Sequence, residues 1–146
     1  MPTLIAIAGL SGSGKTTYIK SLRASIRGGV ADDYLGRSTS RKFIDSRHFV
    51  GLVRALNAGK DCIACDITFC RPRQRAEFEA VIRQVCPATA FEWRFFENDP
   101  ERCLANVRRR ARMNISYEEQ SIRNLTPHYE IPAGAITLPV WRPPGP

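Results

Sequence analysis

The chain has 146 residues, enough for one domain with a buried core and too few for a second domain of similar size. No apolar stretch approaches the ~20 residues that a membrane span needs, which excludes an integral membrane protein built on such helices. Its 22 lysines and arginines outnumber 14 acidic residues and give a net charge of +8. Eighteen of them are arginines, so the charge favours polyanionic partners, the alternative being an ordinary basic soluble protein.

The first predicted element is a buried strand over residues 3–8, and Gly-Leu-Ser-Gly-Ser-Gly-Lys-Thr follows it at residues 9–16. An amphipathic helix over residues 15–27 comes next, and Gly28-Gly29 ends it. Glycine at the first and sixth positions, followed by lysine and threonine, is the phosphate-binding P-loop pattern. A glycine-rich turn that binds nothing is the alternative. The agreement of strand, motif and helix disfavours it.

The motif residues share the task of holding a triphosphate. Glycines permit a backbone geometry that a Cβ would block, so the loop N–H groups converge on phosphate oxygens at the positive end of the helix dipole. Lys15 adds a positive charge for the β- and γ-phosphates, and the Thr16 hydroxyl is placed to ligate Mg²⁺. We therefore expect ATP and Mg²⁺ as cofactors, with the nucleotide bound by Gly9, Leu10, Ser11, Gly12, Ser13, Gly14, Lys15, Thr16 and Thr17.

After this helix, apolar strands alternate with amphipathic helices, which predicts an α/β fold with a mostly parallel sheet. Residues 28–40 are polar and contain glycine, and they predict a mobile loop. Further strands are expected at residues 41–45, 61–66, 88–96 and 135–141. Further helices are expected at residues 46–58, from Pro72, from Pro100 to about residue 112, and from the capping box Ser116-x-x-Glu119. We expect one domain over residues 1–141 and a flexible proline-rich tail over residues 142–146.

The N-terminus and the cysteines both favour a cytoplasmic protein. The chain enters its first strand with no basic leader or cleavage site, and five cysteines fit reduced, buried thiols in that compartment. Cys62 and Cys65 have the spacing of a metal-binding pair. On a strand, however, residues three apart point to opposite faces, which disfavours a zinc or redox pair.

Acids at strand ends are the candidates for metal binding and base catalysis, because ligands of parallel α/β sheets lie at the carboxyl ends of strands. Asp66 ends the strand at residues 61–66 and is the candidate Mg²⁺ ligand, with Thr68 in support. The alternative is a turn or cap residue. Asp45 ends the strand at residues 41–45 and is the candidate base for the acceptor's hydroxyl proton. The alternative is that it caps the helix from Ser46.

Other side chains are candidates for the acceptor site. Arg47 and His48 follow Asp45 and could contact the acceptor, with His48 a weaker candidate for the base. The rival bases Asp32 and Asp33 lie in the predicted loop and not at a strand end. Arg71, Arg73 and Arg75 follow Asp66 and could bind a nucleic-acid backbone or simply be surface charge.

The helix from Pro100 carries the densest basic cluster of the chain: Arg102, Arg108, Arg109, Arg110 and Arg112. One face of this helix could close over the triphosphate and neutralise the charge that develops on the transferred group. The alternative for some of the five is a solvated basic face.

With these residues placed, the chain resembles the small P-loop kinases grouped with phage polynucleotide kinase, over roughly residues 3–132. The P-loop is the specific part of the match, and Asp45, Asp66 with Thr68, and Arg71 to Arg75 follow in the family's order. The family's lid pattern Arg-Asn-x-x-Arg is present as Ala105-Asn106-Val107-Arg108-Arg109, so its first arginine is absent. The resemblance implies a three-layer P-loop kinase fold with a short arginine-rich lid. It also implies Lys15, Asp45 and Arg109 as catalytic residues.

The resemblance also implies a function: an ATP-dependent kinase that acts on a hydroxyl of nucleic acid, DNA before RNA. In size and layout the chain is similar to the phage 5-hydroxymethyluracil DNA kinases, because only 20 residues separate Asp45 and Asp66. That implies transfer to the hydroxymethyl group of the base, or else to a polynucleotide 5′-hydroxyl, with Arg47, His48, Arg71 and Arg73 contacting the substrate. A small-molecule kinase for a nucleoside, sugar or antibiotic remains an alternative. So does an ATPase or binding module that transfers nothing.

Overall fold

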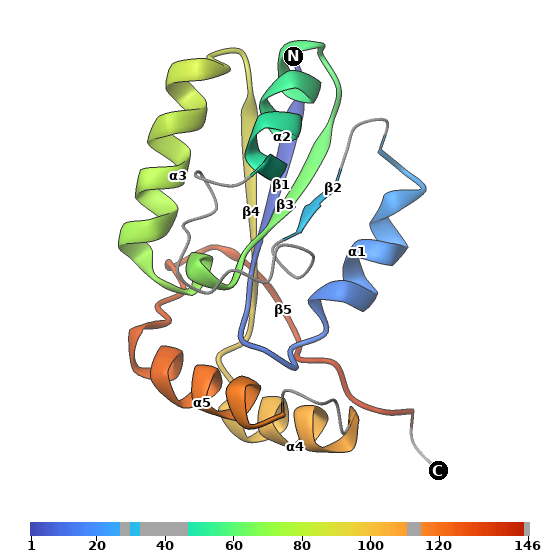
Figure 1. Cartoon of the computed structure of the whole chain (residues 1–146), viewed down its shortest axis with the longest axis vertical. Coiled ribbons are helices and arrows are strands. Elements are labelled where there is room, and N and C mark those ends of the chain that lie inside the picture. The colour runs from blue at the N-terminus through green and yellow to red at the C-terminus, as the bar shows by residue number, and fades with distance from the viewer. Residues whose placement is uncertain (27–29, 33–46, 111–114, 145–146) are drawn as a thin grey trace.

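The computed structural model describes residues 1–26, 30–32, 47–110 and 115–144. The strands of this part of the chain form one parallel sheet in the order β2-β3-β1-β4-β5 (Figure 1). They are β1 Thr3–Ala8, β2 Val30–Asp32, β3 Cys62–Cys65, β4 Ala90–Phe96 and β5 Ile136–Leu138. The helices are α1 Lys15–Arg23, α2 Arg47–Asn57, α3 Pro72–Val85, α4 Pro100–Arg110 and α5 Ile115–Leu125, with short 3₁₀ turns at Ile67–Cys70 and Thr126–His128.

The central strand β1 is buried on both faces, as the near-continuous apolar run of a parallel strand requires. Its alternate side chains enter two cores. Ile5 and Ile7 pack with Ile19 of α1, whereas Leu4 and Ala6 face the core that α2, α3, α4 and α5 share. The sheet is therefore the middle of three layers, and the predicted α/β three-layer fold with a parallel sheet flanked by helices is confirmed.

Helices α4 and α5 lie across the carboxyl end of the sheet, below the strands in Figure 1. Two ion pairs join them. Arg108 Nε lies 2.8 Å from Glu119 Oε1, and Arg110 Nη2 lies 3.1 Å from Glu118 Oε1. This end of the sheet is also where the P-loop leaves β1, so the arginine-rich helix and the loop are neighbours. Within the described residues, no helix is both long and apolar enough to cross a membrane.

Two predicted helix boundaries need correction. The first helix ends at Arg23 and not at residue 27, because the amide and the hydroxyl of Ser25 both donate to Leu22 O and close the last turn. The prediction of a capping box at Ser116 is wrong. Ser116 lies inside α5, which begins at Ile115, and the Glu119 carboxylate accepts from Arg108 on α4 instead of capping its own helix.

The second strand lies where a loop was predicted. Val30–Asp32 pairs in parallel with β3, in the register Val30 with Ile63 and Asp32 with Cys65. Three residues are too short to show a hydrophobic period, so the pairing with β3 defines this strand rather than a local pattern. The strand predicted at residues 41–45, including Asp45, lies outside the described residues.

The predicted opposite orientation of Cys62 and Cys65 is confirmed on β3. Cys62 packs in the core beneath α2 to α5, and Cys65 packs in the core beneath α1, so the two thiols lie on opposite faces of the sheet. All five cysteines are buried.

Candidate functional site

The P-loop turns sharply between β1 and α1, and its backbone explains two of its glycines. Gly12 and Gly14 have φ of 81° and 105°, a left-handed conformation that other residues rarely adopt. A Cβ on Gly12 would lie 2.5 Å from Cys103 O of α4, and a Cβ on Gly14 would lie 2.6 Å from Trp141 Cβ. Both positions therefore require glycine for conformation and for space.

The loop ends at the N-terminus of α1, with Gly14 as its N-cap and no capping side chain on that residue. The first-turn residues Lys15, Thr16 and Thr17 include no acid, so the positive end of the helix dipole is left for an anion. Lys15 Nζ donates to Gly9 O at 2.5 Å and to Leu10 O at 3.1 Å. The ammonium group thus lies over the loop that it is predicted to serve.

Asp66 follows β3 directly, and the residue is 4% exposed. Its Oδ1 accepts from the Thr68 amide at 2.9 Å and from the Thr68 hydroxyl at 2.7 Å, which caps the 3₁₀ turn and fixes the carboxylate. Because β1 and β3 pair in register, with Ile7 beside Cys65, the acid lies level with the start of the P-loop. Asp66 therefore does cap a turn, which was the alternative to metal binding. The cap also orients the carboxylate at the edge of the sheet where a bound metal ion would lie.

The donor set at this edge fits Mg²⁺. A hydroxyl from Thr16 and a carboxylate from Asp66 are the oxygen ligands that this ion prefers. Among the described residues, no group of three or more His, Cys, Asp or Glu side chains could hold a metal alone. A bound Mg²⁺ would therefore take most of its ligands from water and phosphate, as it does at most nucleotide sites.

An acid that the sequence placed in a loop stands instead at a strand end. Asp32 is the last residue of β2, next to Cys65 of β3 and one position before the level of Asp66. The backbone therefore brings Asp32, Asp66 and the P-loop to three adjacent strand ends. Asp45, the predicted base, lies outside the described residues.

The predicted acceptor-binding residues lie on two helices, at the start of α2 and at the start of α3. Arg47 begins α2, and the next residue, His48, is partly buried with an Nε2 atom that has no hydrogen-bond partner among the described residues. Arg71 is half-buried at the start of α3, and Arg73 is exposed on its first turn. Of this group, Arg71 lies nearest to Asp66 along the chain.

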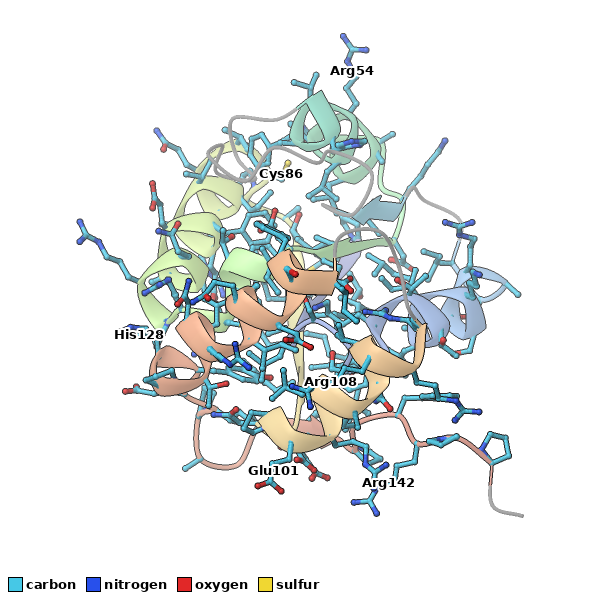
Figure 2. All side chains as sticks on the ribbon, turned by 60° about the horizontal axis from the view of Figure 1, so that its bottom comes forward. Arg54, Cys86, Glu101, Arg108, His128 and Arg142 are labelled. Atoms are coloured by element: carbon cyan, nitrogen blue, oxygen red, sulfur yellow. The ribbon has the colours of Figure 1, made fainter. Side chains whose placement is uncertain are left out.

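Most arginines of α4 already have partners. Arg108 and Arg110 pair with acids of α5, as Figure 2 shows for Arg108 between the two helices. The Arg109 guanidinium lies over the Trp141 ring, with its carbon 5.8 Å from the ring centroid. Arg112 lies outside the described residues.

Sequence reasoning missed two residues that touch the P-loop. Trp141, which follows β5, packs against Gly14 and donates its backbone N–H to Ser13 O at 2.9 Å. Asn106 of α4 is 5% exposed and donates to Gly12 O at 2.8 Å. The sequence signal for Asn106 was the lid pattern that contains it. Nothing local marked Trp141, because its contact with the loop spans more than a hundred residues.

Cys103 lies beneath the loop but is no candidate nucleophile. Burial raises the pKa of its thiol to about 12, although the nearby Lys15 ammonium opposes the shift. The thiol therefore stays protonated near neutral pH.

Arg75 belongs to the core and not to the predicted basic surface. Its guanidinium donates to Phe69 O and Glu130 O, each at 2.7 Å, and lies over the Phe95 ring. Burial lowers its pKa from the ordinary value. The side chain joins α3 to the segment after α5, so of the three arginines that follow Asp66 only Arg71 and Arg73 remain for a ligand.

Replacing Arg75 with leucine is expected to lower the free energy of unfolding by about 2 to 4 kcal/mol, because the buried Phe69 O and the partly buried Glu130 O lose their donor. Urea denaturation followed by circular dichroism measures this value. The matched control is Arg73→Leu on the exposed face, with little expected change. Equal stability of the two variants would show that Arg75 contributes no more than surface charge.

Comparisons with known proteins agree with this geometry. The family model described as an AAA domain matches residues 4–132. No curated protein matches the chain. A gluconokinase from Sinorhizobium meliloti 1021 has a similar solved structure, with a TM-score of 0.64 and 14% identity over 97% of this chain and 85% of that chain.

Two further solved structures are similar. The Mycobacterium tuberculosis APS kinase CysC, in complex with AMPPNP and APS, has a TM-score of 0.58 and 16% identity, covering 97% of this chain and 90% of that chain. Chaetomium thermophilum Kti12, in complex with ADP-AlF3, has a TM-score of 0.56 and 22% identity, covering 93% of this chain and 88% of that chain. At these identities the likeness shows the fold, and it confirms the predicted P-loop kinase architecture.

Proposed function

This chain belongs to the AAA domain family, and we propose that it is an ATP-dependent kinase that transfers the γ-phosphate to a hydroxyl group. The observation that carries the proposal is the convergence at one edge of the sheet. The P-loop leaves β1 there, with the end of β2 and the buried Asp66 after β3 at the neighbouring strand ends. A donor site and an acid for the acceptor are what phosphoryl transfer to an alcohol requires.

Each residue has a proposed task. The amides of residues 9–17 and the Lys15 ammonium hold the triphosphate, while Thr16 and Asp66 hold Mg²⁺, which neutralises charge on the phosphates when bound. A carboxylate at the acceptor side, Asp45 or Asp32, takes the proton of the hydroxyl. The hydroxyl oxygen bonds to the γ-phosphorus as the bond to the β–γ bridging oxygen breaks and ADP leaves. Arg109, whose guanidinium lies over the Trp141 ring, stabilises the charge on the transferred group.

A small-molecule alcohol is the acceptor class that we favour. Similar structures include a gluconokinase and an APS kinase. The basic charge is also less available than the sequence suggested, because Arg75 is buried and Arg108 and Arg110 pair with acids. Figure 2 places Arg54 and Arg142 at opposite ends of the molecule, so these two charges do not lie on one surface.

Nucleic acid is the second candidate acceptor, supported by the net charge of +8. Under this proposal the acceptor is the hydroxymethyl group of 5-hydroxymethyluracil in DNA or a 5′-hydroxyl end. Arg47, His48, Arg71 and Arg73 would then contact the nucleic acid. An exposed Arg73 beside a half-buried Arg71 could contact a phosphate backbone in that case.

The test offers ATP labelled on its γ-phosphate to a panel of acceptors: sugars and sugar acids, nucleosides, 5′-hydroxyl oligonucleotides, and DNA with hydroxymethylated pyrimidines. We expect label on a small molecule. Label on DNA would select the second candidate, and binding that weakens steeply with salt would support it through released counterions. Label only in inorganic phosphate, with every acceptor tried, would contradict the kinase proposal and favour an ATPase.

A further inference from the structure

The side chain of Asn106 joins three parts of the chain that are far apart in the sequence. Its Nδ2 atom donates to Gly12 O at 2.8 Å and to Trp141 O at 2.7 Å. A side-chain amide has two N–H donors, so both are used. The Trp141 backbone N–H in turn donates to Ser13 O at 2.9 Å. Helix α4 and the segment after β5 thus hold two successive carbonyl groups of the P-loop.

Holding a carbonyl also fixes the N–H of the same peptide group, because the group is planar and trans. Asn106 holds Gly12 O, and the N–H of that group, on Ser13, donates to Leu10 O at 3.1 Å. Trp141 holds Ser13 O, so the N–H of Gly14 points away from the segment after β5. Without Asn106 the Gly12–Ser13 group keeps only its hydrogen bond to Leu10 O, and without the Trp141 N–H the Ser13–Gly14 group can rotate, because Gly14 has wide conformational freedom.

We infer that Asn106 is a positioning residue of the phosphate site, which orients the P-loop amides through Gly12 directly and through Trp141 indirectly. The inference rests on the proposed function, since it requires that the loop bind phosphate. Packing alone does not supply this orientation. The α4 backbone already lies against Gly12 through Cys103 O, but that contact holds the helix near the loop without fixing a hydrogen-bond direction.

The test uses inorganic tripolyphosphate as the probe, because it engages the loop without a nucleoside or an acceptor. Asn106→Leu is neutral and of similar size, so it removes both hydrogen bonds without adding charge. We expect its tripolyphosphate affinity, measured by calorimetry, to fall at least about tenfold. We also expect the Gly14 amide signal in ¹⁵N NMR spectra of the unliganded variant to shift.

Asn98 offers a matched control. Its Nδ2 also donates to two carbonyls, Thr126 O at 3.1 Å and Tyr129 O at 3.3 Å, but neither belongs to the P-loop. Asn98→Leu should lower the melting temperature and leave tripolyphosphate affinity unchanged. Equal affinity of Asn106→Leu and the wild type, or an equal loss in both variants, would overturn the inference. Failure of the wild type itself to bind tripolyphosphate would overturn both this inference and the proposed function.

A second pair of variants covers the case in which Asn106→Leu does not fold. Trp141→Ala keeps the backbone N–H that holds Ser13 O, and Trp141→Pro removes it. We expect the proline variant to bind tripolyphosphate at least about tenfold more weakly than the alanine variant. Equal affinities would show that this hydrogen bond does not position the loop.

Discussion

Replacing Lys15 with methionine is expected to reduce phosphoryl transfer by about 10²-fold or more and to weaken ATP binding. Methionine keeps the length of the side chain and removes the only charge that the P-loop sequence itself supplies. In the structure this ammonium contacts Gly9 O and Leu10 O, so it already lies over the loop. The lost interaction becomes stronger as charge develops on the β- and γ-phosphates. We therefore expect a large fall in the rate of phosphoryl transfer and a small change in the stability of the fold. Turnover of labelled ATP and calorimetric ATP titration measure the two effects.

Lys60→Met is the control for this experiment. Lys60 is exposed in the turn before β3, at the opposite end of that strand from the site, and its replacement should change neither value. Denaturation curves for both variants separate a folding defect from a loss of chemistry. A Lys15→Met protein with full activity would contradict the assignment of residues 9–16 as the donor site.

The donor half of the site could be predicted from the sequence because its signal is local. A strand, a glycine-rich turn and a helix stand side by side at residues 3–23, and every part has its own pattern. The strand end at Asp66 was predictable for the same reason, since four buried residues precede it. The buried Arg75 was not, because its partners Phe69 O and Glu130 O depend on how α3 packs.

The proposed acceptor side of the site depends on how strands pair across the sheet. Its position could therefore not be predicted from local sequence patterns. Val30–Asp32 is a strand because β3 lies beside it, and no period of apolar residues marks it. The contact of Trp141 with the P-loop was not predictable for the same reason, because it depends on the pairing of β5 with β4. The sequence thus predicted the local structure of a single segment. It left open the chemistry that two distant segments form together.

The choice between the two candidate bases has the next largest expected effect. Asp32 ends β2 and pairs with Cys65, the residue before Asp66. The proposal for Asp45 rests on the sequence alone. A base that takes the acceptor's proton contributes about 10²- to 10⁴-fold to the rate. We therefore expect one of Asp32→Asn and Asp45→Asn to lose transfer by this factor while ATP affinity stays close to that of the wild type, because a base for the acceptor does not hold the donor.

Asp61→Asn completes the comparison. Asp61 is exposed at the amino end of β3, where its Oδ1 accepts from the Thr3 amide at 2.8 Å, so its loss tests the cost of removing any carboxylate from a strand end. Full transfer by this control, together with a large loss in Asp32→Asn alone, would assign the base to β2. A large loss in Asp45→Asn alone would assign it to the residue that the sequence favoured. If both variants keep full transfer, the acceptor loses its proton without a carboxylate at either position, and the proposed role of an acid at these positions is wrong.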